Sequence, residues 1–331
     1  MVDLTAPKCV VSRCQDKCVW NAFNAVSLQG NIFCSTLFLD TLGIDYDLWI
    51  SEKAGKIQVG AIVLRKGSKI LNSPYNFSMY QGILLSSSVN ELPSHSRAAW
   101  TLETLNGLLD ELTEQYSFLS FCLHYSCDDI RGIQWFHYHQ PELGQFKIEL
   151  FYTGLLELGA VKAWDTYLSS IRRIRQREYK KAIKEGLTIE TSTDIELLEY
   201  LYLKIFERQN AAVELETLKL LRSITNTAIT HGFGELLICK NNSGEAISAL
   251  LYLFDSRSAY NLIAGNHPEH RNSGGGTFVQ LEVIRRCCEK NLRYLDFCGM
   301  NSPNRGDYKA SFNAKPEAYL VAIYKRGISL E

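Results

Sequence analysis

The chain has 331 residues, 46% of them hydrophobic and 21% charged, so it has room for two globular domains and is not a disordered, collagenous or mucin-like chain. Its formal net charge of -1 argues against binding to nucleic acid or membranes through overall charge. No apolar run approaches the roughly 18 residues of a membrane span, and the first residues lack the apolar core of a signal peptide. We therefore expect a cytoplasmic protein.

The ten cysteines contain no CxxC pair. Cys14-x3-Cys18, and His124 between Cys122 and Cys127, come closest to a metal-binding pattern. Structural zinc usually shows two tight ligand pairs. We expect reduced, mostly buried thiols and no metal, with a zinc site or a cysteine nucleophile as the less favoured alternatives.

The two halves of the chain share an order of patterns: a turn and a strand, an aromatic-Asn segment, a helical pattern, and a short apolar strand. The matching segments are 55–64 and 244–253, 75–77 and 260–262, and 119–122 and 295–298. Loop lengths differ while the order is kept, so we favour duplication of one α/β unit over coincidence. The predicted domains are residues 1–160 and 161–331.

In the first half, residues 135–139 alternate like a strand and would place Trp135 and His137 on one face. The second half alternates strands with helical patterns. Its expected strands are 187–190, 235–240, 246–254, 259–264, 293–298 and 318–325. Its expected helices are 164–186, 194–209, 214–231, 276–291 and 307–313. A glycine-rich loop, Arg271–Gly276, precedes the fourth of these helices.

This element order and the loop Arg271-Asn-Ser-Gly274-Gly275-Gly276 resemble the GNAT acyltransferase fold and its pyrophosphate loop, Arg/Gln-x-x-Gly-x-Gly/Ala. Glycines allow successive backbone N–H groups to point into one concavity, and the helix N-terminus adds positive charge. We expect an α/β protein of two tandem GNAT-like domains, each a mixed, mostly antiparallel sheet flanked by helices. Only the second half has the loop, because the first has Gln81-Gly82-Ile-Leu at the comparable place.

The resemblance implies acyl-coenzyme A as co-substrate and assigns its contacts. A pantetheine arm would lie between splayed strands and be held by backbone groups of the second half. The implied cofactor-binding residues are Leu262, Ile263, Ala264, Gly265, Arg271, Asn272, Ser273, Gly274, Gly275, Gly276 and Thr277. Valine at Gly274 or Gly276 should then abolish cofactor binding with the fold intact, and the same change at Gly82 should not matter.

Nearly the whole chain resembles the tandem-GNAT proteins of the Fem type, through Trp164–Gly186 and through Asp296-Phe-Cys-Gly299 followed by Tyr308-Lys-Ala-Ser-Phe312. Gln134–Tyr138 and Phe151-Tyr-Thr153 look more like the coenzyme A-dependent acyltransferases of nucleotide-linked amino sugars. The resemblance implies transfer of an acyl group, such as 3-hydroxybutyryl, to a dTDP-3-amino-3,6-dideoxyhexose in bacterial lipopolysaccharide or capsule synthesis. Acyl group, sugar and oligomeric state stay open.

The implied reaction is direct attack of a free amine on the thioester carbonyl. Asp296 and His267 are the candidate bases, and Tyr308 is the candidate proton donor to the leaving thiolate. Each has a competing structural interpretation: a turn or ion pair for Asp296, a loop histidine for His267, and a packed tyrosine for Tyr308.

The acceptor should bind in a cleft between the domains, with the first domain as its platform. The candidate acceptor-binding residues are Tyr75, Asn76, Tyr80, Arg208, Tyr260 and Lys309. We expect neither a nucleic-acid nor a membrane partner. The basic run 172–184 is interpreted mainly as a solvated helix face, but it keeps open an aminoacyl-tRNA-dependent transferase to a peptidoglycan precursor. A non-catalytic GNAT-fold binding module is the remaining alternative.

Overall fold

The computed structural model describes residues 9–161, 163–207 and 210–327. The chain forms two compact units: unit 1 is built from the chain up to Phe151 and from Ala318 onward, and unit 2 is Tyr152–Glu317. The chain passes from one unit to the other inside two strands, β7 (Phe146–Glu157) and β13 (Lys315–Lys325). The domains 1–160 and 161–331 stay a prediction, and the compact units differ from them in returning the last strand to unit 1.

Unit 1 contains an antiparallel sheet in the order β1-β2-β3-β4, with β5 also pairing with β3, and a pairing of β6 with β13. Its strands are β1 (Val10–Arg13), β2 (Asp45–Lys53), β3 (Lys56–Lys66), β4 (Lys69–Ile70), β5 (Ile83–Leu85) and β6 (Phe118–Leu123). Its helices are α1 (Lys17–Val26), α2 (Thr36–Leu39), α3 (Ser94–Gln115) and α4 (Arg131–Gln134). Leu108 and Leu112 of α3 belong to a core with Val59, Ala61 and Phe121 of the strands.

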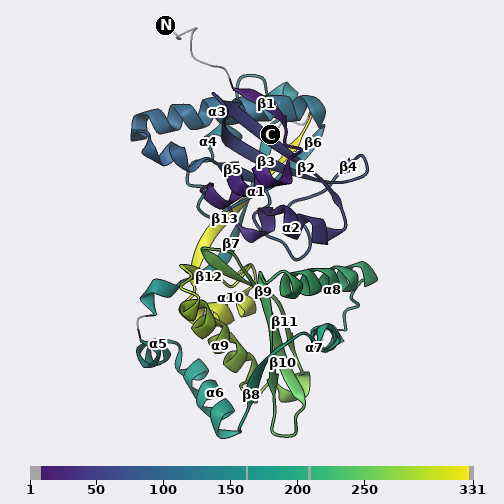
Figure 1. Ribbon diagram of the computed structural model, residues 1–331, viewed down its shortest axis with the longest axis vertical. Coiled ribbons are helices and arrows are strands. Elements are labelled where there is room, and N and C mark those ends of the chain that lie inside the picture. The colour runs from purple at the N-terminus through teal and green to yellow at the C-terminus, as the bar shows by residue number, and fades with distance from the viewer. Residues whose placement is uncertain (1–8, 162, 208–209, 328–331) are drawn as a thin grey trace. The chain divides into compact units, whose positions relative to one another are not determined.

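Unit 2 has the strand order β7-β12-β11-β10-β9-β8, in which only β11 and β12 pair in parallel. Its further strands are β8 (Thr188–Ser192), β9 (Gly234–Lys240), β10 (Ala246–Phe254), β11 (Ser258–Asn266) and β12 (Tyr294–Asp296). Its helices are α5 (Trp164–Ser170), α6 (Arg173–Lys184), α7 (Ile195–Glu207), α8 (Leu215–Thr230), α9 (Gly275–Glu289) and α10 (Pro303–Ala310). Helix α9 covers one face of the sheet, and α7 and α8 cover the other (Figure 1). The expected mixed, mostly antiparallel architecture is confirmed.

Two local expectations are wrong. The helix expected over 164–186 is two helices, because Ile171 and Arg172 lie outside helical backbone between them. Residues 135–139 form turns after α4, with Trp135 N–H donating to the Arg131 carbonyl at 2.8 Å and His137 at a φ of 55°, which a strand does not allow.

No described helix combines the length and the apolar character that crossing a bilayer requires.

Helix α9 is tied to the sheet through Glu235 of β9. The Glu235 carboxylate forms ion pairs with Lys290 at 2.7 Å and with Arg286 at 3.0 Å, and accepts a hydrogen bond from the Tyr252 hydroxyl at 2.7 Å. Burial acts to raise the pKa of Glu235, but these three partners outweigh it and hold the pKa below its ordinary value. The partners therefore stabilise the folded state most when Glu235 is charged.

We expect Glu235→Gln to lower the free energy of unfolding by about 1–2 kcal/mol at neutral pH. The variant removes the negative charge to which Lys290, Arg286 and the Tyr252 hydroxyl bind. The pKa of Glu235 is lower in the folded protein than in the unfolded chain. Its contribution to stability is therefore complete above the unfolded pKa and is lost as the pH falls through the folded pKa. Urea unfolding from pH 7 to pH 3 should therefore show the variant and the wild type converging at acid pH. A difference that persists at acid pH would contradict this account.

Candidate active site

The glycine-rich loop leads from β11, through a short turn at Pro268–His270, into the N-terminus of α9. Gly274 caps the helix with a φ of +87°, and a Cβ there would collide with the backbone carbonyl of Glu178 in α6. The N–H of Gly275 donates to the Ser273 hydroxyl at 3.1 Å. The first N–H groups of a helix have no intrahelical acceptor, so this N-terminus is a cradle for an anion.

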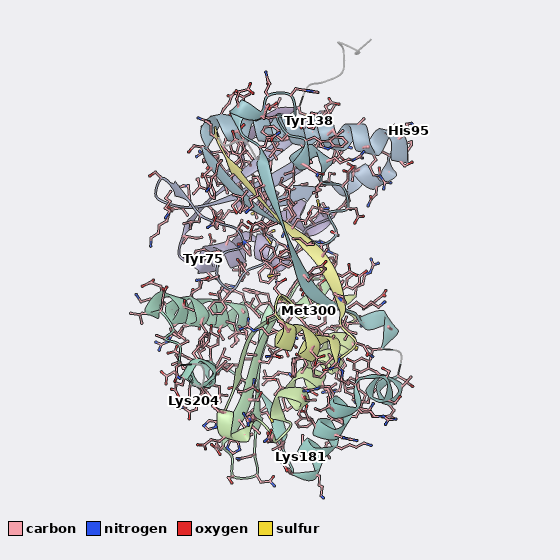
Figure 2. The ribbon with its side chains drawn as sticks, turned by 180° about the vertical axis from the view of Figure 1, so that it is seen from behind. Tyr75, His95, Tyr138, Lys181, Lys204 and Met300 are labelled. Atoms are coloured by element: carbon pink, nitrogen blue, oxygen red, sulfur yellow. The ribbon has the colours of Figure 1, made fainter. Side chains whose placement is uncertain are left out.

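A cavity of about 240 Å3 opens at this cradle, entirely within unit 2. Basic side chains dominate its polar lining. The lining residues are Arg175, Glu178, Lys204, Ile205, Ile247, Asn266, His267, Pro268, His270, Arg271, Gly274, Gly276, Thr277 and Tyr308. Lys204 reaches it from α7, and Lys181 of α6 holds the loop by donating to the Asn272 carbonyl at 2.7 Å (Figure 2). Of the predicted cofactor contacts, Arg271, Gly274, Gly276 and Thr277 line this cavity.

One wall of the cavity is a polar cluster that the sequence did not reveal. Arg175 pairs with Glu178 at 2.6 Å and donates to the Thr277 hydroxyl at 3.0 Å. Its guanidinium also lies 4.9 Å from the centre of the Tyr308 ring. The Thr277 hydroxyl in turn donates to Glu178. These contacts fix α6 against the start of α9 and commit the Thr277 side chain to Glu178.

The predicted opening between strands is present next to the cradle. The parallel pairing of β11 with β12 covers only Ser258–Tyr260 against Tyr294–Asp296. On the other side, residues 263–265 continue to pair with β10, and Leu262 lies at a shift in the register. Successive N–H groups of a strand point to opposite edges, so 262–265 present backbone groups at an edge that β12 leaves unpaired. An extended amide-containing chain could bond there.

Asp296 is fully buried, and its carboxylate holds a turn. The carboxylate accepts hydrogen bonds from the Thr153 hydroxyl and, at 2.7 Å, from the Cys298 N–H. The Gly299 N–H donates to the same Thr153 hydroxyl at 3.2 Å. Cys298 and Gly299 both have positive φ, so the turn needs these fixed partners. This arrangement gives Asp296 a structural role, and its role as base stays a prediction.

Lys309 completes the same turn from α10. Its ammonium group donates to the carbonyls of Cys298 and, at 2.6 Å, of Gly299. Burial lowers the pKa of Lys309, while Cys298 and Asp296 act in the opposite direction. Two of its three protons are thus engaged by the protein, and it supports the turn where we expected an acceptor contact.

His267 and Tyr308 both line the cavity at its cradle. The Tyr308 hydroxyl donates to the Gly276 carbonyl at 3.3 Å, and burial raises the pKa of Tyr308 to about 12. Tyr308 therefore stays protonated at neutral pH, as a proton donor must. Its hydrogen bond to Gly276 supports the cradle, and its role as proton donor to the thiolate stays a prediction.

Tyr308→Phe should raise the KM for the donor and change kcat by less than about tenfold. The variant removes a hydrogen bond that supports the binding site, and in this account the tyrosine does not donate the proton to the thiolate. Steady-state kinetics with varied donor concentration measures both constants. A fall in kcat of about 10²–10⁴-fold at unchanged KM would instead identify Tyr308 as the general acid.

Two of the predicted acceptor residues, Tyr80 and Tyr260, are buried, each within its own unit. Tyr80 is 1% exposed and packs edge-on against His124, Tyr125 and Tyr319. Tyr260 is also 1% exposed, and its hydroxyl donates to Asp255 at 3.1 Å. Burial thus gives both tyrosines core roles in place of acceptor contacts.

Tyr75 is half-buried and Asn76 exposed in a turn of unit 1, where an acceptor contact stays a prediction. Arg208 lies outside the described residues.

The expectation that the fold survives valine at Gly274 is also wrong, and Gly82 is as crowded. A Cβ at Gly274 meets the backbone of α6, and a Cβ at Gly82 would lie 2.6 Å from the Cys122 carbonyl oxygen. Both changes therefore strain the fold. At Gly276 the nearest atom is Asn266 Oδ1 at 2.8 Å, at the end of a side chain that lines the cavity.

Burial keeps three of the described cysteines from acting as activated nucleophiles. Burial raises the pKa of Cys127 and of Cys239 to about 12, and raises that of Cys298 well above its usual range. Such thiols stay protonated at neutral pH and are poor nucleophiles.

Replacing each of the ten cysteines singly with serine or alanine should therefore leave kcat within about tenfold of the wild type in every variant that folds, because no acyl-enzyme is needed. Intact-protein mass spectrometry after mixing with donor alone should show no acylated chain. A trapped acyl-cysteine together with ping-pong kinetics would contradict direct transfer from the donor to the amine.

The comparisons with known proteins concern the fold. Residues 169–310, within unit 2, match the family described as Acetyltransferase (GNAT) domain. The chain is similar to the crystal structure of FemX, with 15% identity over 94% of this chain and 96% of that one and a TM-score of 0.69.

A tandem GNAT protein from the clavulanic acid biosynthesis pathway, solved without AcCoA, shares 12% identity over 98% and 100% of the two chains, with a TM-score of 0.54. L-PGS from Bacillus licheniformis shares 10% over 93% and 91%, with a TM-score of 0.55. These likenesses support the tandem GNAT fold. No curated protein matches the chain.

Proposed function

We propose that unit 2 binds an acyl-coenzyme A and that the enzyme transfers its acyl group to the amine of a nucleotide-linked amino sugar. The single observation that carries the donor is the basic cavity at the N-terminus of α9, beside the open edge of β11. A diphosphate fits the first part and an amide-containing arm the second. The residues that would hold the diphosphate are Arg271 and the backbone of Gly274–Gly276.

The proposed reaction needs no covalent enzyme intermediate. The neutral amine attacks the thioester carbonyl carbon, the C–N bond forms and the C–S bond breaks. The nitrogen loses one proton, and the departing thiolate takes up that proton, directly or by exchange with solvent. Backbone N–H groups of 262–265 would polarise the carbonyl. An amine surrounded by electron-withdrawing hydroxyls is less basic than lysine, so solvent supplies enough of its neutral form, in keeping with the structural role of Asp296.

The acceptor class rests on the sequence resemblance and on Tyr75 and Asn76, which are accessible in unit 1. The test pairs acetyl- and 3-hydroxybutyryl-coenzyme A with a dTDP-amino sugar and measures thiol release and product mass. We expect acceptor-dependent release, and none with the same sugar nucleotide carrying a hydroxyl in place of the amine. Release that ignores the amine would contradict the proposal.

A second candidate, transfer from an aminoacyl-tRNA, is favoured by one feature of α6. Arg173, Arg177, Lys180 and Lys184 recur at helical spacing, are exposed, and form no ion pair within the described residues. Like charges at i,i+4 destabilise a helix by about 0.2–0.5 kcal/mol per pair, so this row of four basic residues slightly destabilises α6. An RNA backbone would neutralise it.

Binding of tRNA at several salt concentrations separates the two candidates. If tRNA carries the donor, log K should fall steeply with log salt, and Arg177→Glu with Lys180→Glu should abolish binding. Under the acyl-coenzyme A proposal these substitutions leave the donor KM within about threefold, because both side chains are exposed and lie outside the cavity lining, where solvent screens their charge. Lys219→Glu, on the exposed part of α8, is the matched control.

A further inference from the structure

Two histidines and a glutamate converge at the mouth of the cradle cavity. Glu245 precedes β10, His267 follows β11, and His270 lies in the short turn before the cradle. One ligand atom from each of the three lies within 4.8 Å of the others. The contact between His270 Nε2 and Glu245 Oε2 is 3.1 Å. The β10–β11 pairing sets this geometry, because it places the start of one strand opposite the end of the next.

One ring nitrogen of His267 has no hydrogen-bond partner. His267 Nδ1 is buried and makes no hydrogen bond. A buried nitrogen left unpaired costs about 1–3 kcal/mol, so such atoms in proteins usually have a partner. The His267 backbone N–H bonds the Ile247 carbonyl at 2.9 Å, which fixes the residue but does not satisfy its ring. Coordination through Nδ1 would provide the missing partner.

We infer that Glu245, His267 and His270 form a binding site for a divalent transition metal of the Zn²⁺ class. Two imidazoles and one carboxylate are a ligand set that Zn²⁺ prefers, and three protein ligands leave at least one position open. The sequence expectation of no metal missed this site, because 22 and 25 positions separate Glu245 from His267 and His270 and no short spacing marks it.

The open position would face an anion. His267 and His270 both line the cavity that contains the cradle, whereas Glu245 lies outside its lining. A metal held by the three could accept water or a phosphate oxygen from a ligand in the cavity. Metal binding itself does not depend on the identity of the acyl donor, so its test is separate from that of the proposed function.

Asn241 and Lys204 are the polar neighbours of the three side chains. Asn241 donates to Glu245 Oε2 at 3.0 Å, so one carboxylate oxygen already has two neighbours. Lys204 also lines the cavity, but its ammonium is paired with Glu207 at 2.7 Å. In the metal-free protein the His270–Glu245 contact holds two of the ligands together, and the metal would take the place of that contact.

The test is a titration of chelator-treated full-length protein with Co²⁺, followed by its visible d–d absorption and by displacement with Zn²⁺. We expect one equivalent to bind. His270→Asn and Glu245→Gln should each weaken binding by at least the ~10–100-fold that loss of an outer-sphere partner causes. Bound Zn²⁺ should also raise the melting temperature of the wild type and not of these variants.

Glu269→Gln is the matched control, because Glu269 is an exposed acid in the same turn and is not one of the three ligands. It should bind Co²⁺ as the wild type does. The metal-free melting temperature of each variant checks that it is folded. Two results would overturn the inference: no stoichiometric binding by the wild type, or a thiolate-to-cobalt charge-transfer band that disappears in Cys14→Ser with Cys18→Ser and persists in His270→Asn.

Discussion

Gly274→Val will destabilise unit 2, whereas Gly276→Val will leave it folded and abolish donor binding. Gly274 has a φ of +87°, and its added Cβ would meet the Glu178 carbonyl in α6, which is backbone and cannot move aside. Left-handed backbone and overpacking together cost about 2–5 kcal/mol. At Gly276 the Cβ meets the end of the Asn266 side chain and then projects into the cavity.

Urea unfolding and calorimetry with coenzyme A separate the two effects. We expect a lower unfolding midpoint for Gly274→Val, and a near wild-type midpoint with donor affinity reduced at least about 100-fold for Gly276→Val, because a branched side chain would occupy the cradle. Gly107→Val in α3 is the control, since a Cβ at Gly107 has no atom within 4 Å. Equal loss of affinity in the Gly107 and Gly276 variants would contradict a donor site in the cradle.

Asp296→Ala should cost about 3–5 kcal/mol of unfolding free energy, the range for leaving a buried charge without its partner. The change removes the acceptor of the Thr153 hydroxyl and the Cys298 N–H, and takes a negative charge from the surroundings of Lys309. Asp296→Asn keeps the shape and one acceptor oxygen, so it should cost less. Thermal and urea unfolding measure both.

The catalytic interpretation of Asp296 makes a different forecast for the same variant. As a general base, Asp296→Asn would keep its stability and lose about 10²–10⁴-fold in kcat. As holder of the turn, it should lose stability and keep kcat within about tenfold at a temperature where it is folded. Thr153→Val should be non-additive with Asp296→Asn, because the two side chains share one hydrogen bond.

The sequence indicated the elements of unit 2 well because its helices and strands have strong periodicity and glycine boundaries. Helix α9 begins at Gly275, directly after Gly274, as the loop pattern required. Short elements were the weak point. Residues 135–139 alternate in polarity, but the alternation arises from turns around the buried Phe136, which stacks on His137 at 3.9 Å. Periodicity over five residues cannot separate a strand from such a turn.

The sequence predicts the loop that forms the cradle, but it does not predict which side chains bond to one another around it. Local sequence predicts a cradle, because a cradle is a backbone feature of consecutive residues. The partners of Thr277 and Asp296 come from Glu178 and Thr153, 99 and 143 positions away, and no local signal marks them. A buried carboxylate in a turn and a catalytic base look the same in sequence, because both are an aspartate at the end of a strand.

The central claim is that unit 2 takes its acyl group from coenzyme A, and calorimetric titration with coenzyme A tests it most directly. We predict one binding site per chain, with affinity that is lost in Gly276→Val and kept in Gly107→Val. Absence of binding to the folded wild type, together with salt-sensitive binding of aminoacyl-tRNA that requires Arg177 and Lys180, would contradict the claim and assign the donor to RNA.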